Sequence, residues 1–340
     1  MILNTNRSVG IIGTGSYIPE KVLTNYDLEK IVETNDEWIK TRTGIIERRI
    51  LDDDKATSYM ATIAAERAID DAGIKNEDID MIIVSTVTPD MAFPSTACIV
   101  QDKLGCTNAA AFDLEAACSG FLYALSVAYA YISSGLYKNV LIIGAETLSR
   151  IVDWTDRNTC VLFGDGAGAA VMSIVPEGMG ILGINLGADG SGGKYLTQPA
   201  GGSKIPATHD TVEKRLHYIK MEGNEVFKFA VRAMEEASKK VIEMSNLKLE
   251  DIDYLVPHQA NIRIIESARK RLKLAKDKVY VNLNKYGNMS SASIPVALDE
   301  AIKANKIKRG DNVLLVGFGG GLTWGSCVIK WHKNQEVQNV

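Results

Sequence analysis

The sequence repeats one pattern at a fixed offset of 173 residues. The segment EDID occurs at 77–80 and again at 250–253, and NVL occurs at 139–141 and again at 312–314. The same offset relates Cys118 to Ser291 and Ser85 to His258. Two separate matches at a single offset are typical of a duplicated structural unit. We therefore expect two similar halves, at residues 1–175 and 176–340.

The hydrophobic pattern predicts alternating strands and helices in both halves. Short apolar runs predict strands at 9–13, 81–85, 109–114, 140–145, 169–175, 181–186, 254–256, 279–281, 313–316 and 326–331. Helical spacing predicts helices at 25–41, 58–72, 95–104, 119–133, 224–244, 260–272 and 293–304. The stretch 187–217 is rich in Gly, Ser, Pro and Thr and is expected to be a long surface loop, and 333–340 a frayed polar tail.

Strands that alternate with helices indicate an α/β protein built in layers. The run SGFLYALSVAYAYIS, at 119–133, is apolar on nearly every side. A helix without a wet face belongs in a protein interior. Two halves of this kind predict a five-layered α-β-α-β-α arrangement, with helices between the sheets as well as outside them.

Composition excludes several classes of function. The net charge of −4 gives no general attraction to nucleic acid or to an anionic membrane. No apolar stretch approaches the ~20 residues of a membrane-spanning helix, and the first residues lack the features of a signal peptide. Five widely spaced cysteines fit reduced thiols in a cytoplasmic protein. With no CxxC pair and four scattered histidines, we expect no structural zinc site.

Cys118 is the first candidate for chemistry. It stands between a predicted buried strand and the all-apolar helix, so its thiol would lie at a helix N-terminus. Unpaired backbone N–H groups and the helix dipole favour a thiolate there, and a thiolate is a nucleophile for acyl transfer. The alternative is a small buried core residue, the usual fate of a free cysteine. Ala116, Ala117 and Gly120 leave room for a substrate, which favours the first interpretation.

Two polar residues of the second half are expected near Cys118. Pro257 ends an apolar strand, so the chain must turn and present His258 at the strand's carboxyl end. Asn288 lies in a glycine-containing loop before a helix, where an asparagine can also be only a turn residue or a cap. Because Asn288 stands three residues before the counterpart of Cys118, pseudo-twofold symmetry would bring all three to one central cleft.

The run Gly319-Gly320-Gly321 is a further candidate. Three glycines can mean only a tight hairpin. They also let a backbone N–H approach a reacting carbonyl and form half of an oxyanion hole. We assign that half to Gly320 and the other half to the N–H of Cys118.

Four segments, FDLEAACSGF, VPHQANIRI, YGNMSSASIP and FGGGLTWGS, resemble the motifs of the β-ketoacyl-acyl-carrier-protein synthase III family. The resemblance covers almost the whole chain, and its specific part is the order Cys, His, Asn. Related elongating synthases carry a second His where Asn288 stands, and degradative thiolases carry a second Cys where Phe318 precedes the glycines. The resemblance implies a thiolase-like duplicated fold with mixed sheets, and a homodimer.

The resemblance also implies a reaction in two stages without a metal or redox cofactor. Cys118 would take an acyl group from acyl-CoA. His258 and Asn288 would then stabilise the enolate that forms when malonyl-acyl carrier protein loses CO2, and this carbanion would attack the acyl group. The product would be a 3-ketoacyl-carrier protein, at the start of fatty acid synthesis.

Binding roles carry over from the resemblance at matching positions. They comprise a site for the CoA nucleotide, a residue that closes the partner's acyl pocket across a dimer interface, and a basic surface for the acidic carrier protein. The residues are Trp38, Arg42 and Arg157 for the nucleotide, Phe93 for the acyl pocket, and Lys228, Arg263, Arg269 and Lys270 for the carrier protein.

Two other functions stay open on the sequence alone. A thiolase-fold acyltransferase could move the acyl group from Cys118 to a different acceptor, with His258 as general base. A catalytically silent module could only recognise CoA or carrier protein, although intact Cys118, His258 and Asn288 argue against silence. The preferred primer is not readable, because one methylene changes binding by only ~1–3 kcal/mol.

Overall fold

The computed structural model describes residues 7–333 and contains two larger sheets. The first has the order β1 (Val9–Tyr17), β7 (Gly166–Ile174), β6 (Val140–Glu146), β4 (Met81–Ser85), β5 (Ala110–Leu114). The second has the order β8 (Gly180–Ala188), β13 (Thr323–Lys330), β12 (Asn312–Gly319), β11 (Tyr254–Pro257). In both sheets the first two pairings are antiparallel and the pairings that follow are parallel. The duplication read from the sequence thus appears as two sheets of one topology.

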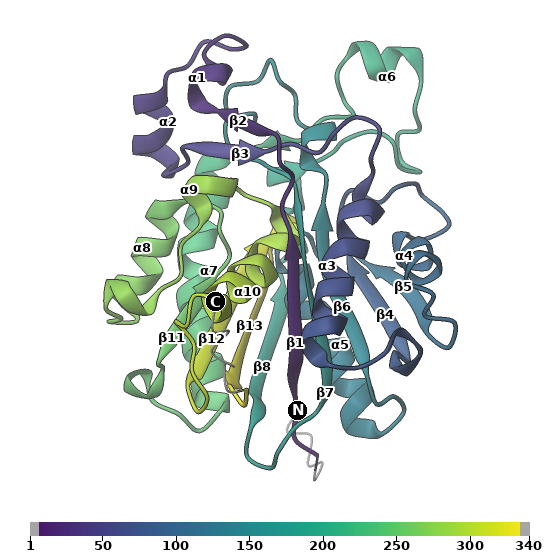
Figure 1. Ribbon diagram of the computed structural model, residues 1–340. Coiled ribbons are helices and arrows are strands. Elements are labelled where there is room, and N and C mark those ends of the chain that lie inside the picture. Colours follow the sequence, from purple (N-terminus) through teal and green to yellow (C-terminus); the bar gives the residue numbers. More distant parts are fainter. Residues whose placement is uncertain (1–6, 334–340) are drawn as a thin grey trace.

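Two helices lie between the sheets. Helix α5 (Gly120–Ser134) and helix α10 (Ser293–Lys303) each contact strands of both sheets. Helices α3 (Thr57–Ala72) and α4 (Thr96–Leu104) cover the outer face of the first sheet, and α7 (Gly223–Met244) and α8 (Ile262–Arg271) cover that of the second (Figure 1). The five-layered α/β prediction is confirmed.

The remaining elements gather around one end of the layers (Figure 1). They are β2 (Val22–Thr24), α1 (Asn25–Leu28), α2 (Asp36–Thr43), β3 (Glu47–Arg49), β9 (Leu196–Thr197), α6 (His209–Glu213), β10 (Lys220–Met221) and α9 (Leu283–Tyr286). Segment 22–49 crosses to the second half, where the Ile46 N–H donates to the carbonyl of Asn284. Buried Arg48 ties the segment to the first half by donating to the carbonyl of Val161. This crossing brings α2 beside α8.

Three sequence predictions differ from the structure. The expected strand at 279–281 is only an isolated parallel bridge between Val279 and Leu255. The expected helix at 25–41 is two helices, α1 and α2. The Asn35 side chain accepts a hydrogen bond from the Trp38 N–H and so caps the N-terminus of α2. The expected loop at 187–217 contains α6, a short strand and a 3-10 turn. Of the expected polar tail, residues 334–340 lie outside the described residues.

Within residues 7–333, no helix has both the length and the apolar character needed to cross a bilayer.

Candidate active site

Cys118 lies in a 3-10 turn, Ala117–Ser119, which leads directly into α5. Ala117 has a φ of 45°, in the left-handed region that non-glycine residues seldom adopt. This turn swings the chain from the end of β5 into the central helix. Gly120 follows because a Cβ there would stand 1.9 Å from the Ser85 hydroxyl oxygen. The Cys118 side chain lies at the start of the central helix, where the first interpretation placed it, and it is buried, as the alternative interpretation expected.

The expected thiolate is not the resting form of Cys118. Burial raises the pKa of its thiol to about 12, and a carboxyl group, that of Glu146, acts in the same direction. Loss of water around the sulfur thus outweighs the stabilisation expected from the helix N-terminus. A proton acceptor and hydrogen-bond donors must therefore assist when Cys118 reacts.

His258 directly follows β11 and is almost fully buried. Its backbone N–H donates to the carbonyl of Val316 at 2.8 Å, which continues the pairing of β11 with β12. The Phe318 ring packs edge to face against the imidazole, with 5.5 Å between the centres of the two rings. Burial lowers the pKa of His258 to about 3, so the imidazole is neutral. Among the described residues neither ring nitrogen has a hydrogen-bond partner, which leaves both to act on a substrate.

Asn288 is fixed by its own backbone. Its N–H donates to the carbonyl of Leu162 at 2.8 Å, and its carbonyl accepts from the N–H of Gly164 at 3.0 Å. The side-chain Oδ1 accepts from the Ser290 N–H at 2.8 Å. This bond orients the amide and leaves Nδ2 as the group that can donate to a ligand.

One cavity of about 100 Å³ joins the three residues. Cys118, His258 and Asn288 all line it, and the rest of its wall is mainly apolar. The apolar wall comes from Leu162, Phe163, Leu196, Met221, Val226, Phe227, Ala260, Ile264 and Phe318. The chain therefore encloses a thiol, a neutral imidazole and an amide in a space without charge.

Of the three consecutive glycines, Gly319 lies nearest to the nucleophile. A Cβ on Gly319 would stand 2.5 Å from the Cys118 nitrogen, whereas a Cβ on Gly320 would find its nearest neighbour, the Ala117 Cβ, at 3.4 Å. The sequence analysis assigned the oxyanion role to Gly320 and missed the spacing role of Gly319. The two roles are compatible, because Gly319 admits the Cys118 backbone and Gly320 keeps the N–H that is expected to form half of the oxyanion hole.

Trp38, Arg42 and Arg157, the residues that the resemblance assigns to the CoA nucleotide, come together at the surface. The Arg157 guanidinium carbon lies 4.6 Å from the centre of the Trp38 ring, and that of Arg42 lies 5.9 Å from it. Trp38 and Arg42 are on α2, and Arg157 lies in the connection between β6 and β7. Two cations beside one indole form a platform suited to a planar, negatively charged nucleotide.

The four basic residues expected to meet a carrier protein fall into two groups. Lys228 and Arg263 are exposed beside the cavity, where the Arg263 guanidinium lies 5.3 Å from the centre of the Phe227 ring. Arg269 and Lys270 stand near the far end of α8. Arg269 is engaged with the carboxylate of Glu266 and the carbonyl of Leu274.

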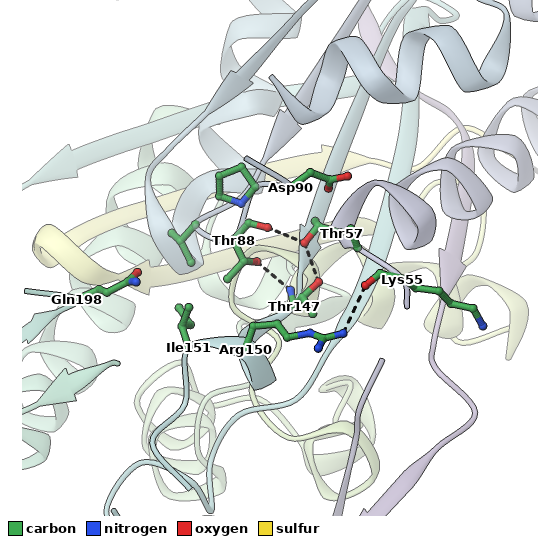
Figure 2. Close-up of a pocket in the computed structure, with 11 residues that line it drawn as sticks. Lys55, Thr57, Thr88, Asp90, Thr147, Arg150, Ile151 and Gln198 are labelled. Atoms are coloured by element: carbon green, nitrogen blue, oxygen red, sulfur yellow. Dashed lines mark hydrogen bonds between the residues drawn. The ribbon is translucent and has the colours of Figure 1, made fainter. Parts of the chain in front are cut away.

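A second cavity, of about 350 Å³, lies where the chain leaves β4. Figure 2 shows Thr57, Thr88 and Thr147 joined by hydrogen bonds on its wall, with Arg150 and Gln198 beside them. The segment that borders this cavity at Asp90 continues to Phe93, whose side chain is 84% exposed. So large an exposed aromatic ring is suited to contact with another molecule.

Family models and individual relatives both match the chain. A model described as 3-oxoacyl-(acyl-carrier-protein) synthase III matches residues 112–190, and a model of the C-terminal part of that enzyme matches residues 242–331. A β-ketoacyl-acyl-carrier-protein synthase III of Caldanaerobacter subterraneus subsp. tengcongensis is 66% identical over 326 residues, covering 96% of this chain and 98% of the relative. The chain belongs to the β-ketoacyl-acyl-carrier-protein synthase III family. As a member it is a condensing enzyme of the acyltransferase class in fatty acid biosynthesis.

Solved structures of the family agree with this fold. The 3-oxoacyl-(acyl-carrier-protein) synthase III of Aquifex aeolicus VF5 has a TM-score of 0.88 at 51% identity, over 95% of this chain and 100% of that chain. The corresponding enzyme of Pseudomonas aeruginosa PAO1 has a TM-score of 0.89 at 38% identity, over 97% and 100%.

Proposed function

We propose that this synthase condenses a short acyl-CoA, such as acetyl-CoA, with malonyl-acyl carrier protein to give 3-ketoacyl-carrier protein, CoA and CO2. The observation that carries the proposal is the convergence of Cys118, His258 and Asn288 on one cavity, with the imidazole neutral and both its nitrogens unpartnered among the described residues. Its free thiols fit a place in the cytoplasm, where such groups stay reduced.

The first stage transfers the acyl group to Cys118. The sulfur attacks the thioester carbonyl, a new S–C bond forms, and the bond between the acyl carbon and the CoA sulfur breaks. The thiol proton passes through the neutral His258 to the leaving CoA sulfur. The N–H groups of Cys118 and Gly320 stabilise the negative charge on the carbonyl oxygen of the tetrahedral intermediate.

The second stage forms the carbon–carbon bond. His258 and the Nδ2 of Asn288 donate to the malonyl thioester oxygen, which becomes negative as the bond to CO2 breaks. The electron pair left by CO2 attacks the acyl carbon on Cys118, and the sulfur departs. A neutral imidazole suits this role because it can donate without a charge that would bind the ground-state carboxylate instead.

The two substrates would bind at two different regions of the surface. The CoA nucleotide would insert its adenine beside Trp38, between or against the Arg42 and Arg157 guanidiniums. The acidic carrier protein would dock on the basic surface of α7 and α8, at Lys228, Arg263, Arg269 and Lys270. Charge within a Debye length of ~8 Å decides such docking, so the net charge of the chain does not oppose it.

A second copy of the chain would complete the acyl pocket. Phe93 is 84% exposed, and in a homodimer its ring would be withdrawn from water against the partner. Dimer formation is tested by sedimentation equilibrium of the wild type and of Phe93→Ser. A monomeric wild type would contradict it.

The function is tested by the mass of the products formed from acetyl-CoA and malonyl-acyl carrier protein. The condensing reaction gives acetoacetyl-carrier protein, absent with Cys118→Ser. Asn288→Ala should still carry an acetyl group on Cys118 but form no condensed product. If Asn288→Ala condensed at the wild-type rate, its proposed role would be wrong. An acetylated wild type without any condensed product would favour the alternative, transfer to another acceptor.

A further inference from the structure

The duplicated fold contains a second copy of the nucleophile turn. The offset of 173 residues takes Ala117 to Ser290 and Cys118 to Ser291. Ala117 and Ser290 both have a φ of 45°, and each turn leads into a central helix, α5 or α10. The two 3-10 turns, Ala117–Ser119 and Ser290–Ala292, pack against each other. Where the first half carries Ala117 and Cys118, the second half therefore carries Ser290 and Ser291.

The strand ends that face the two turns are also related by the offset, but they carry different residues. Gly319 faces the Cys118 nitrogen, while its counterpart Glu146 faces the Ser291 nitrogen. The Glu146 side chain is fully buried, and its Oε1 accepts from the Ser291 hydroxyl at 2.8 Å. Its Oε2 accepts from the Val87 N–H at 3.1 Å and from the Thr88 hydroxyl at 2.8 Å. A carboxyl group thus fills the space that corresponds to the oxyanion hole.

Ser290 stands between these two environments. Its side chain is only 3% exposed, and its hydroxyl makes no well-formed hydrogen bond to any residue within 7–333. A buried hydroxyl without a partner costs free energy and calls for an explanation. Its position supplies one, because its turn packs against the turn that carries Cys118, and its hydroxyl lowers the pKa of the Cys118 thiol.

We propose that Ser290 is a further catalytic residue, whose hydroxyl donates a hydrogen bond to the Cys118 sulfur when that sulfur is negatively charged. The O–H bond stays intact, and the thiol proton still leaves through His258. The sulfur is negative twice in the proposed reaction, at acylation and when the carbon–carbon bond has formed. The inference rests on the proposed role of Cys118 as the nucleophile.

The other polar groups named at the site have different roles or do not stabilise a negatively charged Cys118 sulfur. The N–H groups of Cys118 and Gly320 are assigned to the carbonyl oxygen, and Asn288 to the malonyl oxygen. The ionisable groups near the sulfur are His258, which is neutral, and two carboxyl groups, Glu146 and Glu115, which disfavour a thiolate. Ser290 is the hydroxyl that counters them. Because a hydrogen bond to a charged group is worth ~1.5–3 kcal/mol, its loss should slow thiolate reactions about ten- to a hundredfold.

The test measures the alkylation of Cys118 by iodoacetamide as a function of pH, without either substrate. Failure of the hydroxyl role is then distinguishable from failure of the condensing function. The variants are Ser290→Ala, which keeps the backbone strain, and Ser290→Gly, which relieves it. Ala117 holds the same φ at the equivalent position, so an alanine can occupy the turn. Thermal unfolding confirms that each variant folds.

Both variants should alkylate about tenfold more slowly or worse at neutral pH, with the pH profile displaced upward. Decarboxylation of malonyl-acyl carrier protein depends on His258 and Asn288, so its rate reports whether the turn has kept its place. Wild-type alkylation in both variants would overturn the proposal. So would slow alkylation in Ser290→Ala alone, since strain would then be the cause. An equal loss of decarboxylation would show that the whole turn had moved, and would overturn it as well.

Discussion

Replacement of Gly319 by alanine tests how closely the second half of the fold approaches the nucleophile. Gly319 has a φ of −160°, an extended conformation open to any residue, so the substitution adds no backbone strain. Its added methyl would stand 2.5 Å from the Cys118 nitrogen and 3.2 Å from both the Cys118 Cα and the Ala117 Cβ. These neighbours are backbone atoms or a short side chain, which cannot rotate away.

The size of the effect follows from that distance. The Cys118 nitrogen must retreat by about half an ångström to reach even the shortest tolerable contact. A displacement of ~1 Å at a reacting group costs about a hundredfold in rate, so we expect kcat/KM to fall about ten- to a hundredfold. Overpacking of this kind also costs ~1–3 kcal/mol in the free energy of unfolding.

The assay is the initial rate of condensation of acetyl-CoA with malonyl-acyl carrier protein, together with urea unfolding. Gly320→Ala is the matched control, since its Cβ would meet nothing closer than 3.4 Å and the residue keeps its N–H. We expect Gly320→Ala to stay within a few-fold of the wild type. Full activity in Gly319→Ala, or an equal loss in both variants, would refute the argument from close approach.

Three further predictions concern other parts of the molecule. Trp38→Ala should raise the KM for acyl-CoA about tenfold with little change in kcat, because stacking on a base is worth ~1–3 kcal/mol, whereas Trp38→Phe should retain most affinity; equal kinetics in all three would remove Trp38 from the CoA site. Burial lowers the pKa of His258 to about 3. As pH falls below ~6.5, this histidine therefore binds a proton in the unfolded chain but not in the folded chain, and the free energy of unfolding decreases. Between about pH 7 and pH 5 the wild type should therefore lose ~2 kcal/mol more in free energy of unfolding than His258→Asn; an unchanged difference would contradict a neutral buried imidazole. Asp153→Asn should destabilise the fold and flatten its acid sensitivity, because the Arg215 guanidinium lowers the pKa of that buried carboxyl and the stabilisation is lost as pH falls below ~4; parallel acid unfolding curves would refute this.

Much of the active site was predictable because it depends on the duplication. The ends of equivalent strands and the starts of equivalent helices meet at one pseudo-twofold axis, so an offset in sequence locates Cys118, His258 and Asn288 in space. The same offset also pairs Glu146 with Gly319, a difference in residue type as informative as that of Cys118 and Ser291. Ser290 could not be recognised, because its significance lies in the absence of a hydrogen-bond partner within the described chain.

The errors have physical reasons that local sequence does not carry. The apolar residues near Val279 are partly buried at a sheet edge, where a single bridge to Leu255 suffices and no ladder forms. The pattern at 25–41 has helical composition throughout, but Asn35 can cap a new helix only once tertiary contacts have turned the chain there. Cys118 rests as a protonated thiol because its side chain is deeply buried. Its position at the start of a helix does not by itself predict so deep a burial.

The carboxyl group of Glu146 sets how many acyl groups one chain can hold. A twofold scaffold offers two equivalent reaction centres, and each needs room beside a backbone N–H for a thioester oxygen. In this chain the room beside the Ser291 N–H is taken up by the protein's own carboxyl oxygen. If Cys118 is the nucleophile as proposed, the expected stoichiometry is one acyl group per chain, and each primer must be discharged at Cys118 before another can be loaded.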